Sequence, residues 1–301
     1  MRIKLRSFIS FGHTFLAIFV FLNISLFSGQ LLAQYFLGPV SSGFGGAGVG
    51  GIESSESVFL NPAAISHGAT LEMGMFYEDA QKFLGEDFVS YGLSVIDNSK
   101  SVLFSGGVGY LSRHRYVPAA PDIDETYLQM GISYGLKPNL SVGLSISNLE
   151  QQSIIEEITQ LQFGVGAHYI YSPTLFLGVT LENLNTFQDT DLSDSERLPR
   201  ATSIGADWRA NEFLRLRSDI RYLYDNNPDK KMIYAMGLES RMGDYFLIKF
   251  GYNKNDPQNV DYNVWSVGFK GPRLNMTYSY KKGVKGEYGG MHSVDFRVPL
   301  W

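Results

Sequence analysis

The stretch RLNMTYSYK, residues 273–281, alternates polar and apolar side chains without a break. Its odd positions carry Arg, Asn, Thr, Ser and Lys, whereas its even positions carry Leu, Met and Tyr. Since successive side chains of a β-strand point to opposite faces, this segment has one polar and one apolar face. The stretch therefore predicts a strand that separates two unlike environments.

The same alternation recurs along the chain. In residues 213–223, for example, Leu214, Leu216 and Ile220 interleave with charged side chains. The pattern predicts about fourteen strands, each near the ~10 residues that a tilted membrane-spanning strand needs. The predicted strands are 70–79, 87–96, 101–112, 126–135, 140–148, 159–170, 174–183, 200–209, 213–223, 231–241, 245–253, 262–269, 273–281 and 291–300.

The connections between these strands alternate in length. Six short turns, at 98–100, 137–139, 172–173, 210–212, 242–244 and 271–272, alternate with seven longer connections. An up-and-down outer-membrane barrel has tight periplasmic turns and longer outer loops, which gives this alternation. An even number of strands also returns both ends of the chain to one side, so we expect both termini in the periplasm.

A soluble propeller or sandwich is the alternative, but its strands are typically about 5–6 residues long and its polar face meets solvent. In a bilayer, strands with one apolar face are stable only as a closed ring, because an open edge leaves backbone groups unpaired in hydrocarbon. The predicted fold class is all-β: a transmembrane, antiparallel, up-and-down β-barrel in the outer membrane of a Gram-negative bacterium, with the lipid bilayer as its surroundings.

Composition excludes several other classes of protein. The chain has 301 residues, of which 44% are hydrophobic and 18% charged, so it is too apolar for disorder. It has no Cys, which excludes a disulfide scaffold and a thiolate metal site. A net charge of −5 argues against nucleic-acid binding.

Both ends of the chain carry signs of export. Residues 1–33 combine three basic residues, an apolar run and Leu-Leu-Ala before Gln34, as in a secretory signal peptide. We expect it to be cleaved by the export machinery; an uncleaved membrane anchor is the alternative, but the apolar run is short for a spanning helix. The last residues, FRVPLW, resemble the aromatic-ended final strand of outer-membrane proteins, which implies recognition by the barrel-assembly machinery.

The segment from residue 34 to residue 68 differs from the rest. Its first half is rich in Gly, including Gly43, Gly45, Gly46 and Gly48, and its second half contains Asn61, Pro62 and Ala63. Three of its glycines match G-x-G-x-x-G, but no strand precedes them, so no dinucleotide or other cofactor is expected. Because Gly permits close packing, the segment is expected to fold compactly in a narrow space. The chain thus divides into 1–33, 34–68 and 69–301.

These residues resemble the N-terminal region of the FadL superfamily of outer-membrane proteins, and further short motifs, such as Leu198-Pro199-Arg200, resemble its PorV/PorQ-like branch. The resemblance implies that the segment is a hatch inside a fourteen-stranded barrel. It also implies FadL-like passage of small, hydrophobic solutes past that hatch. The alternative is a PorV-like accessory of protein secretion, as in type IX-like systems, which would anchor or shuttle secreted proteins.

The polar faces of the C-terminal strands carry many charges of both signs. Arg215, Arg217, Asp219 and Arg221 form a ladder along one predicted strand. Either these charges pair with one another and dock the hatch, or they line a charge-selective path. Arg273 belongs to the same set of expected lumen charges.

The sequence holds no sign of catalysis. It has neither an H-E-x-x-H pair nor a G-x-S-x-G elbow, so we expect no enzyme and no catalytic or metal-binding residues, and a barrel enzyme is only a remote alternative. His114 is expected to belong, with Arg113 and Arg115, to a solvated basic cluster in a long loop.

Overall fold

The computed structural model describes residues 38–51, 55–83, 86–99, 103–116, 121–153, 157–184, 187–188, 198–224, 231–284 and 289–300. The expected signal peptide, 1–33, and the last residue, Trp301, lie outside this part of the chain. Helical structure in the described residues consists of α2 (Pro39–Ser42), α3 (Ser57–Leu60) and the 3-10 helix η1 (Pro62–His67). None of these helices has the length and apolarity needed to cross a membrane.

Strands make up most of the described residues. They are β1 (Leu71–Phe83), β2 (Glu86–Asp97), β3 (Ser105–Tyr116), β4 (Ile123–Lys137), β5 (Leu140–Gln152), β6 (Glu157–Ser172), β7 (Leu175–Glu182), β8 (Phe187–Gln188), β9 (Ala201–Arg209), β10 (Leu214–Leu223), β11 (Met232–Met242), β12 (Phe246–Asn255), β13 (Val260–Lys270), β14 (Asn275–Gly283) and β15 (Gly290–Pro299).

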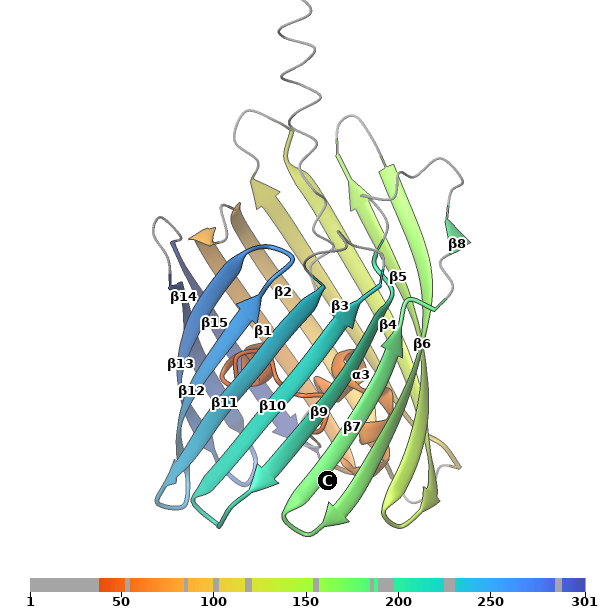
Figure 1. Cartoon of the computed structure of the whole chain (residues 1–301), viewed down its shortest axis with the longest axis vertical. Helices are drawn as coiled ribbons and strands as arrows, with labels where there is room; N and C mark the ends of the chain where they lie inside the picture. The colour runs from red at the N-terminus through yellow and green to blue at the C-terminus, as the bar shows by residue number, and fades with distance from the viewer. Residues whose placement is uncertain are drawn as a thin grey trace, which may run out of the picture. The chain divides into compact units, whose positions relative to one another are not determined.

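Fourteen of these strands close into one antiparallel barrel (Figure 1). Each strand pairs with its neighbour in the chain, and the ring closes where β1 pairs with β15 over ten residue pairs. The two-residue strand β8 lies outside the ring and pairs only with β6 among the described strands. The predicted fold class is therefore confirmed, and each predicted strand corresponds to one strand of the ring.

The alternation of side chains places polar groups inside the barrel and apolar groups outside. On β10, Leu216 and Ile220 are 37% and 45% exposed on the outer face, whereas Arg217 is 5% exposed and faces inward. This arrangement follows from the period of two, since a one-residue shift would turn every charge outward.

Two expectations about charged residues are wrong. The strand β3 continues to Tyr116, so Arg113 and Arg115 lie in a strand; both point inward and pair with Glu125 at 3.4 and 3.0 Å. The two arginines are therefore not part of a solvated loop, because the alternation of inward and outward side chains continues to the end of β3. Arg273 is exposed in the turn before β14, outside the strand on whose polar face it was expected.

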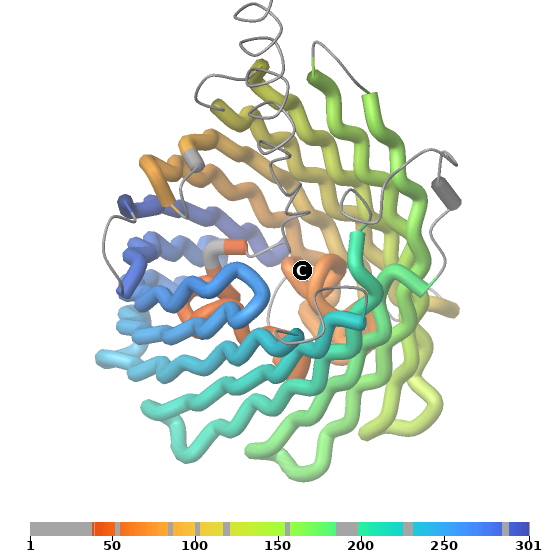
Figure 2. The backbone as a smooth tube through the Cα atoms, turned by 45° about the horizontal axis from the view of Figure 1, so that its top comes forward, coloured from red at the N-terminus to blue at the C-terminus, as the bar shows by residue number. Residues whose placement is uncertain are grey.

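Residues 38–51 and 55–68, which we call the inner segment, lie within the ring (Figure 2). Val58, Phe59 and Ile65 of this segment pack in one buried cluster against side chains of β1, β2 and β3. The short helices are held by local signals: Asn61 accepts a hydrogen bond from the backbone of Ala63 at the start of η1, and Pro62 occupies its first turn.

Candidate functional site

Inward-facing glycines of the wall set how closely the inner segment approaches. Four cross-strand pairs of them are directly opposite in register, and three of these pairs meet the backbone of the inner segment: Gly143–Gly166, Gly178–Gly205 and Gly237–Gly251. A Cβ at Gly178 would lie 2.0 Å from the carbonyl oxygen of Val49, and one at Gly237 would lie 2.3 Å from the Cα of Phe44. Only Gly allows backbone to pack on backbone here.

These wall glycines are not among the predicted site residues. A signal was present, because each occupies an inward position of an alternating strand where other strands carry a polar side chain. A Gly in the interior of a strand often marks the close approach of another backbone.

The Gly-rich half of the inner segment lies against β10, β11 and β12. Gly45 and Gly46 have φ of 69° and 99°, a left-handed backbone that favours Gly. A Cβ at Gly43 would lie 2.7 Å from the Cδ of Lys249, and Gly48 donates its backbone N–H to Asp219. All four glycines predicted as site residues thus contact the wall or form the turn that fits it.

Asn61 joins the two halves of the inner segment to the wall. Its side chain is fully buried, and its Nδ2 donates to the carbonyl oxygens of Val49 at 2.9 Å and Ala167 at 3.2 Å. The next residues continue this contact: a Cβ at Gly143 would lie 2.4 Å from the backbone nitrogen of Ala63 and 2.6 Å from the carbonyl carbon of Pro62. The three residues therefore meet β5 and β6.

The ladder of β10 is paired along its length. Asp207, which is fully buried, accepts from Arg215 Nε at 2.7 Å and from Arg217 Nε at 2.9 Å, and Arg221 pairs with Glu182 at 2.8 Å. The fourth member, Asp219, accepts hydrogen bonds from the backbone N–H groups of the inner segment. These come from Gly48 at 2.6 Å and Val49 at 2.9 Å.

The ladder also holds an aromatic ring of the inner segment. The Arg217 guanidinium lies 4.4 Å from the centre of the Phe44 ring, and the Lys249 ammonium lies 4.7 Å from it. Cations placed over an aromatic face are attracted to its π electrons. Phe44 is therefore fixed by charge as well as by packing.

Two titratable groups of the inner segment are shielded from water: Glu56 is buried and His67 is half-buried. Glu56 accepts from the backbone N–H groups of Val40 at 2.8 Å and Ser41 at 3.0 Å, and burial raises the pKa of its carboxyl above the ordinary 4.5. The His67 ring lies 5.3 Å from that of His168, whose Nε2 is 3.1 Å from the Gly50 carbonyl oxygen. Burial lowers the pKa of His67 below 6.5.

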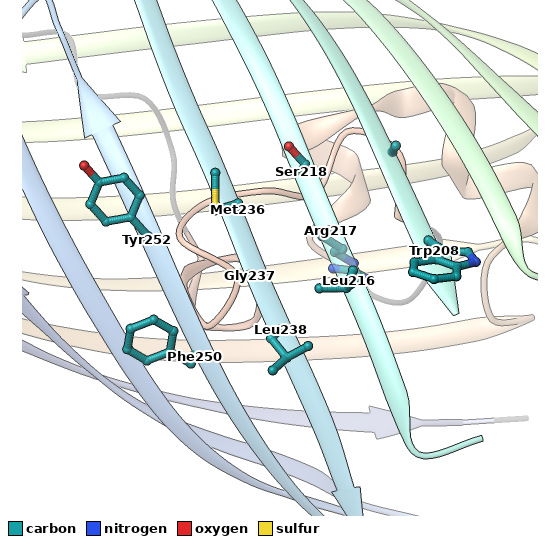
Figure 3. Close-up of a pocket in the computed structure, with 10 residues that line it drawn as sticks. Trp208, Leu216, Arg217, Ser218, Met236, Gly237, Leu238, Phe250 and Tyr252 are labelled. Carbon is teal, nitrogen blue, oxygen red and sulfur yellow. The ribbon is translucent and has the colours of Figure 1, made fainter. Parts of the chain in front are cut away.

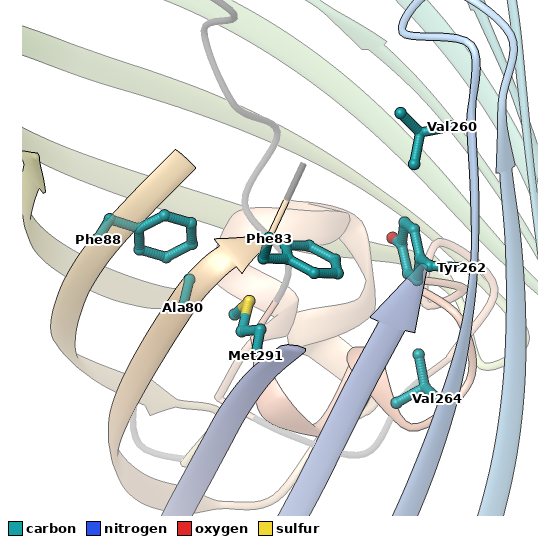
Figure 4. Packing of buried hydrophobic residues seen from close by; sticks show 7 residues of the cluster. All are labelled: Ala80, Phe83, Phe88, Val260, Tyr262, Val264 and Met291. Carbon is teal, nitrogen blue, oxygen red and sulfur yellow. The ribbon is translucent and has the colours of Figure 1, made fainter. Parts of the chain in front are cut away.

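A different sector of the lumen is apolar (Figure 4). We call its residues the lumen apolar cluster. They come from β1, β2, β13 and β15 and are Ala80, Phe83, Phe88, Val260, Tyr262, Val264 and Met291. The Phe83 and Tyr262 rings meet edge to face at 5.6 Å. Closer to the inner segment on the same strands, the cluster ends at Glu78, which pairs with Lys281 at 3.6 Å.

This cluster was also not predicted. Val264 and Trp265 are consecutive apolar residues, and such a break in alternation is the signal that an apolar side chain faces inward. In one strand alone, two consecutive apolar residues are a common irregularity of the alternating pattern and do not indicate a site. It becomes meaningful only when four strands of the ring bring such positions together.

Comparison with solved structures places this fold among known barrels. The CymD monoaromatic hydrocarbon channel superimposes with a TM-score of 0.64 at 12% identity, over 87% of this chain and 96% of that one. The toluene transporter TbuX of Ralstonia pickettii gives 0.62 at 10% identity, over 88% and 97%. A FadL homologue of Pseudomonas aeruginosa gives 0.57 at 12% identity, over 88% and 98%. The chain has the FadL-type barrel fold.

No protein-family model and no curated protein matches the sequence. The expected FadL-like architecture is confirmed by the fold, whereas the PorV-like branch and the secretion alternative gain no support from these structures. The three proteins are described as a channel, a transporter and a FadL homologue, none of them as an enzyme.

Proposed function

We propose that the chain is an outer-membrane barrel that passes small, uncharged, hydrophobic solutes across the outer membrane. The inner segment acts as the hatch, with Gly43, Gly45, Gly46, Gly48, Asn61, Pro62 and Ala63 docking it to the wall. The proposal includes removal of residues 1–33, both termini in the periplasm, and assembly of 69–301 by the barrel-assembly machinery.

The lumen apolar cluster carries this proposal. A water-filled barrel has a polar interior, because every apolar side chain that faces the pore exposes its surface to water. Here four strands present apolar side chains inward at the loop end of the lumen. These side chains pack on one another and are at most 5% exposed, so a solute must part them to enter. A hydrophobic solute that does so gains roughly 25 cal/mol for each Å² of its own surface removed from water.

The charges of the interior support an uncharged solute. The buried charged side chains of the described residues are balanced, with eight acids and eight bases. The acids are Glu56, Glu72, Glu78, Glu125, Asp207, Asp219, Glu239 and Asp295, and the bases are Arg113, Arg115, Arg215, Arg217, Arg221, Lys249, Lys281 and Arg297. A charge-selective path requires an excess of one sign of charge, which attracts ions of the opposite sign. The balanced interior has no such excess.

Hydrocarbon transport by structural relatives points the same way. The solved structures with this fold include a monoaromatic hydrocarbon channel and a toluene transporter. Toluene is therefore the probe of choice.

Uptake by whole cells tests the proposal. Radiolabelled toluene and the anion benzoate are given to cells that lack such channels and express the chain. We expect faster toluene uptake than with an empty vector and no change for benzoate. The double variant Val264→Thr/Met291→Gln keeps the volume of the cluster but makes it polar, and it should reduce the gain in toluene uptake. The matched control is Val267→Thr, on the outer face of β13, the strand that also contains Val264. This control should not reduce toluene uptake. Toluene uptake equal to that of the empty vector would refute the function.

The hatch is tested separately. Deleting residues 38–68 should admit benzoate as well as toluene, since the inner segment then no longer fills the ring. Circular dichroism of the purified variant checks that the barrel still forms. Unchanged benzoate uptake through a folded variant would contradict the hatch.

A further inference from the structure

The outer face of the barrel carries a groove of about 430 Å³ between β9 and β12 (Figure 3). Its walls are apolar side chains, among them Trp208, Leu216, Leu238 and Phe250. Trp208 and Phe250 are 47% and 45% exposed. The groove is therefore open to the surroundings of the barrel, and it is separate from the lumen.

Two adjacent rows of side chains create the groove. In one row, Trp208, Leu216, Leu238 and Phe250 stand side by side across the four strands. In the next row, Ala206 and Ser218 are directly paired, and both are small. Small residues beside a row of large ones leave a depression, whose floor is the paired backbone of Arg217 and Gly237.

The groove lies at the middle of the barrel wall. Ser218 is near the centre of β10, and its partner Met236 is near the centre of β11. In a membrane-spanning barrel this height corresponds to the hydrocarbon layer, well away from the headgroups. The material that meets the groove at this depth is the acyl chain of a lipid.

We propose that this groove is a binding site for one acyl chain of a membrane lipid. The inference goes beyond solute passage, but it rests on the proposed position in the outer membrane. A chain seated beside Trp208 fills the hollow between the two rows and adds packing contacts to the side chains that face it. It also backs the wall where Phe44 of the inner segment contacts Gly237 from inside.

Tryptophan fluorescence distinguishes a bound chain from bulk lipid. The chain has three Trp, at 208, 265 and 301. The variant Trp265→Phe/Trp301→Phe reports from Trp208 in the groove, and Trp208→Phe/Trp301→Phe reports from Trp265, which is 45% exposed on the outer face of β13. Both are reconstituted in vesicles with increasing fractions of a phosphatidylcholine brominated on its acyl chains, which quenches Trp on contact.

We expect quenching of Trp208 to saturate at a several-fold lower fraction of brominated lipid than quenching of Trp265. Adding Ser218→Leu fills the groove and should make the Trp208 curve follow that of Trp265. Adding Ser218→Ala leaves the groove open and should change nothing.

Equal curves for the two reporters, or a saturating Trp208 curve that survives Ser218→Leu, would overturn the acyl-chain site alone. If neither Trp is quenched, the proposed membrane position fails as well. Weaker quenching of Trp208 than of Trp265, together with a dimer that Ser218→Leu dissociates, would assign the groove to a second copy of the chain and overturn the lipid site.

Discussion

At the scale of single residues, the absence of side chains matters as much as their presence. The wall glycines allow Val49, Phe44 and Ala63 to touch the strands through their backbones. The same contacts make the wall sensitive to a single methyl group, because packed backbone cannot move aside as the end of a flexible side chain can.

Gly178→Ala should therefore loosen the inner segment. Its Cβ would lie 2.0 Å from the Val49 oxygen and 2.6 Å from the Val49 carbonyl carbon, so we expect a loss of about 1–3 kcal/mol in docking. Chymotrypsin should then cut at Phe44 or Phe59, both buried in the native protein, with the sites identified by mass spectrometry. The matched control is Gly135→Ala, whose Cβ meets only a backbone oxygen at 4.0 Å. Equal protection of both variants would contradict backbone packing.

At the scale of elements, β10 connects the wall to the inner segment. Its arginines pair within the wall, while its one aspartate, Asp219, satisfies two backbone N–H groups of the inner segment. Buried N–H groups without an acceptor are costly, so this carboxylate stabilises the backbone of Gly48 and Val49 against the wall.

Asp219→Ala should release this turn more than Asp219→Asn does. Alanine leaves the N–H groups of Gly48 and Val49 without their acceptor, at a cost of about 1–3 kcal/mol each, whereas asparagine keeps one acceptor oxygen. The rate of chymotrypsin cleavage at Phe44 measures the difference. Asp244→Ala, in an exposed turn, provides the reference. Identical rates for the two Asp219 variants would show that the carboxylate does not hold the segment.

The strands were predictable because a period of two is a local property. Alternation located every strand of the ring, and its errors fall at strand ends. The predicted strand 101–112 ends before Arg113, whereas β3 continues to Tyr116, and the predicted strand 273–281 begins two residues before β14. Near a loop, polar side chains occur on both faces, so the pattern weakens before the strand ends. Strand β8 has two residues and too short a pattern to detect.

At the scale of the whole molecule, the site depends on contacts that no local pattern contains. Asp219 lies 170 residues from Val49, and the lumen apolar cluster joins the first strands of the ring to its last. The charges of β10 were visible in the sequence, but their partners Asp207 and Gly48 became evident only when the ring was closed. Closure is therefore the property on which both the docking of the inner segment and the lumen apolar cluster depend.

Closure can be tested by linking the first and last strands. Met75 and Phe296 are directly opposite across the seam, and the chain has no Cys, so Met75→Cys/Phe296→Cys should form a single disulfide. It would close most of the chain into one loop and raise the free energy of unfolding by about 5 kcal/mol, seen as a higher temperature of heat unfolding on gels. The pair Met75→Cys/Val298→Cys is displaced in register, since Val298 lies opposite Met73, and its Cα atoms are about 7–8 Å apart, too far for a disulfide. If the displaced pair links and the opposite pair does not, the seam has a different register.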